Sequence, residues 1–317
     1  MSICRKFSVW AQSPSLLFAL IILTGMPAGA QTLSNAARTT QSTLSALNRL
    51  DSFNPADDFA TPSPADEDLG EQLLLTKNQR YRPFSINANW ATTWTSNAFY
   101  TPSHPVSDVF MNGSVGAVAL PNLGNNFFLE ASAKIQGYRY FRNPVLDFNS
   151  IEAGAGLLKV FREFSDAGLY ARYQYTDLFS ARGAGELLHQ HSIITGVRKM
   201  FQFSRANALF LSAEASFNLG GSPNYALASE YTFFAAHQVQ WTRYLQSSLY
   251  YQMQTLAFAE GGRADFRNSL GLSLNYQPLK WFSVYTTTWL GWNASNEEQY
   301  NFFVANLGGG LGASINF

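Results

Sequence analysis

The sequence contains very little cysteine and little charge. Cys4 is the single cysteine among 317 residues, and it precedes an apolar N-terminal stretch. The chain that follows this stretch therefore has no internal disulfide, no cysteine metal site and no cysteine nucleophile. Charged residues make up 13% of the chain and aromatic residues 15%, whereas a soluble domain has about 25% charged residues. This composition is typical of a protein whose surface is not entirely in water.

Long hydrophobic runs are also missing. Two basic residues near the start precede an apolar stretch at residues 16–24, and an Ala-Gly-Ala sequence occupies residues 28–30. This order predicts a secretory signal peptide over residues 1–30, cleaved near Ala30. The apolar stretch is shorter than the run of about 20 residues that a spanning helix needs. No other segment approaches that length, so we do not expect a helical membrane protein.

The charge is unevenly distributed. Without the signal peptide the chain has a net charge of −2, of which residues 31–75 contribute −5 and the remainder +3. Such a mildly basic remainder argues against nucleic-acid binding as the main task.

Residues 31–81 form a region of their own. Apolar or small residues at positions 33, 37, 40, 44 and 47 have the spacing of a short amphipathic helix. An acidic, proline-rich stretch follows and reads as a linker. We expect a tether or loosely ordered periplasmic segment here, with a plug or a helix for a periplasmic partner of residues 31–75 as alternatives.

From residue 82 to residue 317 the apolar pattern has a period of two, which predicts strands with one apolar face. Most of the runs have 10 to 13 residues, whereas ordinary strands have about 5 to 6 and a strand tilted across a bilayer needs about 9 to 11. Twelve runs are found, at residues 84–95, 109–120, 127–139, 149–161, 167–176, 189–201, 207–219, 231–243, 247–256, 267–277, 282–292 and 302–317.

The links between these runs alternate between long and short, as in barrels with long external loops and short periplasmic turns. Aromatic residues recur at the short-turn end, where a membrane interface favours them. The spacing between successive aromatics in the sequence is similar to the length of a propeller blade. A propeller blade packs four short strands into that length, whereas here each spacing holds two long strands. The predicted interface aromatics are Phe161, Phe201, Trp241, Trp281 and Phe317.

These features together resemble the outer-membrane β-barrel proteins of Gram-negative bacteria. The resemblance covers about residues 80–317 and implies an antiparallel up-and-down transmembrane β-barrel of about twelve strands. It also implies contact with outer-membrane lipid and recognition by the barrel-assembly machinery through the last strand. The positions that match that assembly signal are Leu311, Ala313, Ile315 and Phe317.

Strand parity predicts which side chains point into the barrel, because alternate residues of a closed barrel face inward. Six charged residues have this parity, all on the third to seventh strands, so we expect a lumen with charge on one side. The remaining strands offer mainly amides, hydroxyls and rings. The predicted lumen residues are Glu130, Lys134, Glu152, Arg172, Arg198, Glu214, Tyr170, Gln238 and Gln252.

Three functions remain open. A narrow channel or porin for small polar solutes is the first, since charges that line a path set its selectivity. A plugged structural or partner-binding barrel, in which the charges neutralise one another, is the second. The third is an outer-membrane lipid hydrolase, for which Ser192 has the wrong strand face relative to His189 and His191. We expect no catalytic residues and no cofactor. We also expect no metal site, because no acidic cluster joins these histidines.

Overall fold

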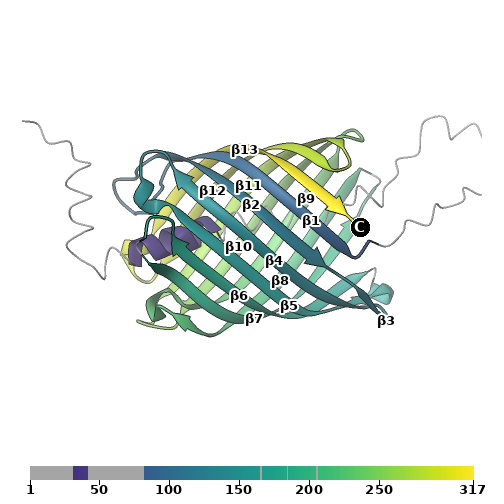
Figure 1. The fold of residues 1–317 in the computed structure, drawn as a ribbon, viewed down its shortest axis with the longest axis horizontal. Helices are drawn as coiled ribbons and strands as arrows, with labels where there is room; N and C mark the ends of the chain where they lie inside the picture. The colour runs from purple at the N-terminus through teal and green to yellow at the C-terminus, as the bar shows by residue number, and fades with distance from the viewer. Residues whose placement is uncertain (1–30, 42–81, 165, 184, 205) are drawn as a thin grey trace, which may run out of the picture.

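The computed structural model describes residues 31–41, 82–164, 166–183, 185–204 and 206–317. Residues 82–317 form a closed antiparallel β-barrel of twelve long strands with one short extra strand (Figure 1). The predicted fold class is therefore confirmed. The strands are β1 (Phe84–Thr95), β2 (Asp108–Ala119), β3 (Asn122–Gly124), β4 (Phe127–Tyr140), β5 (Phe148–Phe161), β6 (Ala167–Ser180), β7 (Glu186–Gln202), β8 (Asn207–Ser222), β9 (Ala228–Gln240), β10 (Leu245–Phe258), β11 (Ala264–Leu279), β12 (Phe282–Ser295) and β13 (Phe302–Asn316).

The barrel closes where its first and last strands meet. β1 pairs with β13, Trp90 lying across from Leu311, and β1 also pairs with β2. Closure leaves no long strand with an unpaired edge, which a strand in lipid cannot tolerate. The extra strand β3 pairs only with the beginning of β4.

Each of the twelve sequence runs corresponds to one long strand. Differences occur at the strand ends: β7 begins at Glu186 instead of residue 189, and β11 covers Ala264–Leu279 instead of 267–277. Backbone pairing continues there beyond the alternating segment, because the ladder needs hydrogen-bonding partners but no apolar face. The short strand β3 was not expected.

The two barrel ends differ. β1 begins and β13 ends at one of them, which we call the terminal end. At the opposite loop end lie the connections at residues 96–107, 141–147, 181–185, 223–227, 259–263 and 296–301. Among the described residues, no helix has the length and apolar character to cross a membrane.

Side chains alternate between an apolar outer wall and a mixed inner one. Leu270, Leu272 and Leu274 on β11 are 42%, 43% and 40% exposed, whereas inward Tyr138 and Phe234 are fully buried. Buried aromatic and aliphatic residues fill much of the interior toward the loop end. The barrel therefore exposes apolar surface on its outside and has a packed interior. A soluble β-sandwich, in contrast, has polar outer faces.

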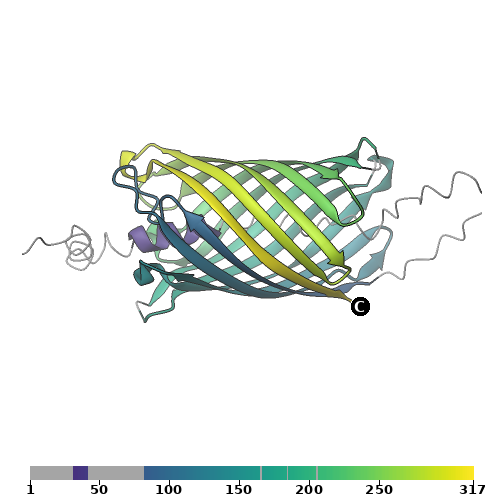
Figure 2. The same cartoon turned by 90° about the horizontal axis from the view of Figure 1, so that it is seen from above.

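The described part of the N-terminal region, residues 31–41, is helical and lies inside the loop end of the barrel (Figure 2). Ala36 and Ala37 belong to the interior cluster of buried residues, with Leu33 packed against it. The sequence favoured a tether for this segment, yet these residues are docked in the lumen. The acidic linker lies outside the described residues, and the periplasmic placement of the region stays a prediction.

Candidate functional site

Inward side chains of β4, β6, β7 and β8 build a charged cluster around Arg172. Its Nη1 donates to Glu130 Oε1 at 3.0 Å, and its Nη2 lies 3.9 Å from Glu214 Oε2. The Tyr170 hydroxyl donates to the same Glu214 oxygen at 2.6 Å. The Arg172 and Arg198 guanidinium carbons each lie 5.5 Å from the Tyr170 ring centroid. We call these five residues the central cluster.

A neighbouring pair extends this charged wall. Lys134 on β4 lies directly across from Glu152 on β5, an arrangement in which opposite charges attract. Glu152 also accepts a hydrogen bond of 2.7 Å from the Gln41 side chain of the N-terminal helix. All six charged residues that parity assigned to the lumen therefore lie on the inner wall, though whether they line a solute path stays a prediction.

The N-terminal helix bridges opposite walls of the barrel through polar side chains. Arg38 donates to the Ala226 carbonyl oxygen and forms an ion pair of 2.5 Å with Glu230 on β9. Thr40 Oγ1 lies 3.2 Å from the hydroxyls of both Tyr100 and Tyr140 on the other side. Because these partners come from distant strands, the helix crosses the lumen instead of lying along one wall.

A second charged group lies beside the helix at the loop end. Arg263 binds the carboxylate of Asp265 through two nitrogens, at 2.9 Å and 2.5 Å, and donates to Asn35 Oδ1 at 3.1 Å. Its guanidinium carbon also lies 3.4 Å from the Tyr300 ring centroid. With Arg38 and Glu230, these side chains form what we call the latch cluster.

The latch cluster corrects the expectation that charge is confined to one side of the lumen. Glu230 and Asp265 lie on β9 and β11, and Arg267 is buried on β11 as well. Glu230 and Arg267 have the inward parity of their strands. Arg267 begins the predicted run 267–277 and Glu230 lies one residue before the run 231–243, so parity could have found both. Docking of Arg38 had no sequence signal, because it depends on a contact 192 residues away.

The opposite wall is lined by amides. Gln238 and Gln252 are 4% and 2% exposed, and neither Oε1 accepts a hydrogen bond from the described chain. Asn275 Oδ1 likewise accepts no hydrogen bond from the described chain. A buried amide oxygen left without a donor costs about 1–3 kcal/mol, so these atoms call for water or solute beside them. These amides give this wall polar, uncharged hydrogen-bonding groups.

Burial of Tyr100 fixes its protonation state at the loop end. Removal from water raises the pKa of its hydroxyl to about 12, while the contact with Thr40 opposes that shift. The hydroxyl therefore stays protonated at physiological pH and provides a neutral anchor for the helix.

The predicted interface aromatics all lie at the terminal end. Trp241, Trp281 and Phe317 are 63%, 55% and 57% exposed, Phe201 is 38% exposed, and Phe161 is half-buried. The proposed assembly positions Leu311, Ala313 and Ile315 pair with β1. The position of the aromatics at one end of the barrel suits a membrane boundary. The roles of the aromatics and of the assembly positions stay predictions.

The histidines of β7 lie on the outer face, away from the lumen. His189 and His191 contact each other, while Ser192 is buried on the inner face. A nucleophile and base on opposite faces cannot reach one another. Within the described ranges, no group of three or more His, Cys, Asp or Glu side chains is arranged to hold a metal ion.

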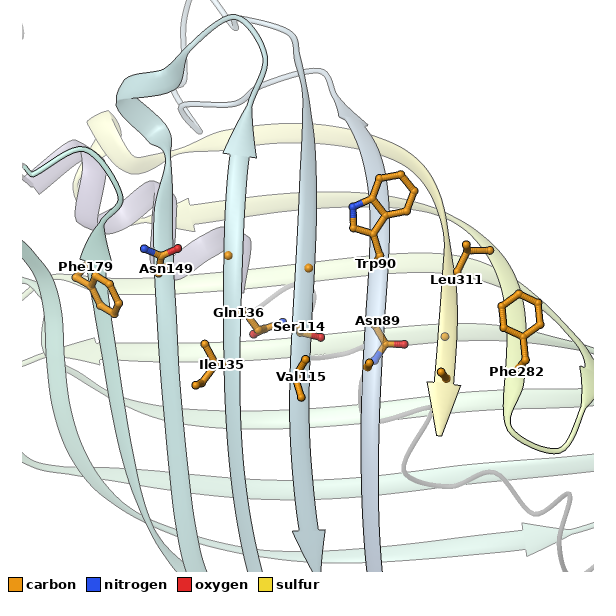
Figure 3. A pocket seen from close by; sticks show the side chains of 15 residues that line it. Asn89, Trp90, Ser114, Val115, Ile135, Gln136, Asn149, Phe179, Phe282 and Leu311 are labelled. Atoms are coloured by element: carbon orange, nitrogen blue, oxygen red, sulfur yellow. The ribbon is translucent and has the colours of Figure 1, made fainter. Parts of the chain in front are cut away.

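A depression of about 690 Å³ crosses the wall near the β1–β13 closure (Figure 3). Trp90, Val115, Ile135 and Leu311 line it, and all four are among the exposed apolar residues of the outer wall. Inward-facing Asn89, Ser114 and Gln136 also line it, so the depression is apolar on its outer side and polar on its inner side.

Comparison with solved structures gives the same fold. The chain is similar to an outer membrane channel from Pseudomonas putida F1, with 11% identity, a TM-score of 0.51, and coverage of 74% of this chain and 96% of that one. It is also similar to KdgM porin, with 10% identity, a TM-score of 0.41, and coverage of 72% and 99%. No protein-family model and no curated protein matches the sequence. The resemblance to outer-membrane barrels is thus confirmed at the level of fold.

Proposed function

We propose that this protein is an outer-membrane channel for small polar solutes whose lumen is plugged at the loop end by its own N-terminal helix. The observation that carries the proposal is the docking of residues 31–41 across a polar lumen. The channel fold of the Pseudomonas putida structure and the signal-like N-terminus support the location and the class.

The contacts of the helix suit a plug that can leave. Ion pairs and hydrogen bonds hold it, and its apolar contribution is limited to Leu33 and two alanines. Water replaces such polar contacts at little net cost, since a hydrogen bond contributes only about 0.5–1.5 kcal/mol to stability. An apolar plug would instead have to expose its buried surface to water.

The side chains of the lumen wall suit small polar solutes. The central cluster places two arginines beside two carboxylates, and the opposite wall offers unpaired amide oxygens. Twelve strands enclose less space than the 16 to 18 of wide porins, so passage would be restricted to small solutes.

Conductance of the full chain in planar bilayers tests the proposal. Arg38→Glu places two carboxylates together in place of the ion pair with Glu230, so the plug should loosen and conductance should rise. Arg38→Glu with Glu230→Arg restores the opposite charges and should lower conductance again. Arg243→Glu, in an exposed turn at the terminal end, is the matched control and should behave as the unaltered protein.

Two results would contradict the proposal in different ways. If correctly folded protein and Arg38→Glu both fail to conduct, the channel assignment is wrong. If both conduct equally, the barrel is a channel but the helix is not its plug.

A further inference from the structure

The outer wall near the loop end contains a polar cluster that the channel proposal does not use. His189 and His191 alternate with inward-facing Gln190 on β7, so both imidazoles lie on the outer face. Directly across on β6, Asp177 pairs with His189 and Tyr175 pairs with His191. The two histidines are among the first six residues of β7, at the loop end of the barrel, where the membrane interface tolerates polar side chains and water can reach them.

The ring nitrogens of the two histidines have different partners. Nδ1 of His189 lies 3.7 Å from Glu186 Oε1, and Nδ1 of His191 contacts the Tyr173 hydroxyl. The two Nε2 atoms face each other at 2.8 Å. Each imidazole therefore directs one nitrogen to an oxygen and the other to a shared point between the rings.

A small rotation of the two rings would turn this arrangement into a metal-binding imidazole pair. A ligating histidine holds the cation with one nitrogen and gives the N–H of the other to a carboxylate or another oxygen. Glu186 and Tyr173 occupy that supporting position. Without a cation, one Nε2 must carry a proton for the pair to attract each other, so the same geometry accepts either a proton or a metal ion.

Ligand type selects among cations. The 2.8 Å separation of the Nε2 atoms, with ring centroids 4.8 Å apart, is that of a hydrogen bond between the rings, so a bound cation needs a small rotation of the imidazoles. Imidazole nitrogen suits Cu²⁺, Ni²⁺ and Zn²⁺, and Cu²⁺ has the highest affinity in the divalent series.

We propose that His189 and His191 form a two-ligand Cu²⁺ site on the outer wall of the barrel, with Glu186 and Tyr173 orienting the rings. Solvent completes the coordination, because no third His, Cys, Asp or Glu of the described chain joins the pair. The site is independent of the lumen and of the plug.

Titration of untagged, refolded full-length protein with Cu²⁺ tests the proposal by electron paramagnetic resonance. We expect one ion per chain with hyperfine coupling to two imidazole nitrogens. His189→Gln and His191→Gln should each lower the affinity at least about tenfold, and Tyr173→Phe should weaken it less. Zn²⁺ should bind more weakly than Cu²⁺, and Mg²⁺ should not compete because it prefers oxygen ligands.

His237→Gln is the matched control. His237 also lies on the outer face, but its neighbours across β8 and β10 are Leu209 and Leu249. Its loss should leave the titration unchanged. An equal loss of affinity in this variant, a single coupled nitrogen, or no saturable binding would overturn the proposal, and tighter binding of Zn²⁺ than of Cu²⁺ would overturn the choice of cation.

Discussion

At the scale of single residues, the outward and inward faces of one strand set opposite costs for a charge. Leu272 and Ser273 are neighbours on β11, the first 43% exposed on the outer wall and the second half-buried on the inner one. A charge at position 272 should therefore destabilise the barrel, whereas a charge at position 273 should be tolerated.

We expect Leu272→Arg to lower the free energy of unfolding by roughly 2–4 kcal/mol, since a guanidinium near the bilayer midplane loses its water. Ser273→Arg, the matched control, should cost less, because its neighbours across the strands are the polar Ser248 and Thr287. Reversible unfolding in lipid vesicles measures both. Equal costs would mean that the outer wall of the barrel does not face lipid.

Residue roles could be predicted from the sequence only where strand parity decides them. Parity placed Glu130, Arg172 and Glu214 on one inner wall. In the structure a carboxylate oxygen of each glutamate lies within 4 Å of the Arg172 guanidinium. It could not place Arg38, because a short polar helix carries no mark of the surface that it docks against. The pairing of His189 with His191 was also missed, since side-chain rotation brings their nitrogens together.

At the scale of strands, glycines make room for inward aromatic rings. Gly271 lies directly across from Tyr250, and a Cβ built at Gly271 would lie 2.3 Å from Cζ of that ring. Tyr250 is 1% exposed and stacked on Phe234, with ring centroids 6.2 Å apart, so it has little freedom to move. The same pairing joins Tyr170 to Gly196, which makes it a recurring device of this barrel.

We expect Gly271→Ala to destabilise the barrel by about 1–3 kcal/mol, the usual cost of overpacking. Tyr250→Ala removes a buried ring and is itself costly, but in that background Gly271→Ala should be nearly neutral, because the ring that clashes is gone. Gly113→Ala is the control, since its nearest neighbour would lie 3.8 Å away. Chemical denaturation in vesicles measures the three single variants and the double variant, and a harmless Gly271→Ala in the unaltered background would show that the ring is free to shift.

The glycine-rich last strand illustrates what the sequence could and could not predict about an element. Its alternation predicted a strand with an apolar outer face. A Cβ at Gly310 would lie 2.4 Å from the Trp90 carbonyl oxygen on β1. Glycine therefore allows close strand approach at the closure of the barrel, which no pattern within one strand could have located.

At the scale of the whole molecule, the period of two predicted the architecture because lipid imposes one constraint on every strand. Each long strand must carry an apolar outer face and pair on both sides, so all twelve were visible in the sequence. The interior has no such common rule. Side chains there pair across strands or with the plug, and these choices depend on the closed barrel rather than on any one segment.

The electrical behaviour of the barrel should follow from the central cluster. Arg172 and Arg198 lie beside Glu130 and Glu214, so the paired change Arg172→Glu and Arg198→Glu would gather four carboxylates on one wall. In a narrow path, a permeating ion stays within the Debye length of about 8 Å at physiological salt. The change should therefore shift the permeability ratio several-fold toward cations.

The measurement is the reversal potential in a salt gradient, made in the Arg38→Glu background so that the plug does not limit the current. Arg162→Glu with Arg243→Glu is the matched control, because both residues are exposed in turns at the terminal end and the net charge changes equally. If the lumenal pair shifts the potential and the control pair does not, the charge acts locally within the path and not through the net charge of the protein. A conducting protein whose reversal potential responds equally to both pairs would mean that the central cluster does not line the path, and that solutes pass along the amide wall of Gln238 and Gln252 alone.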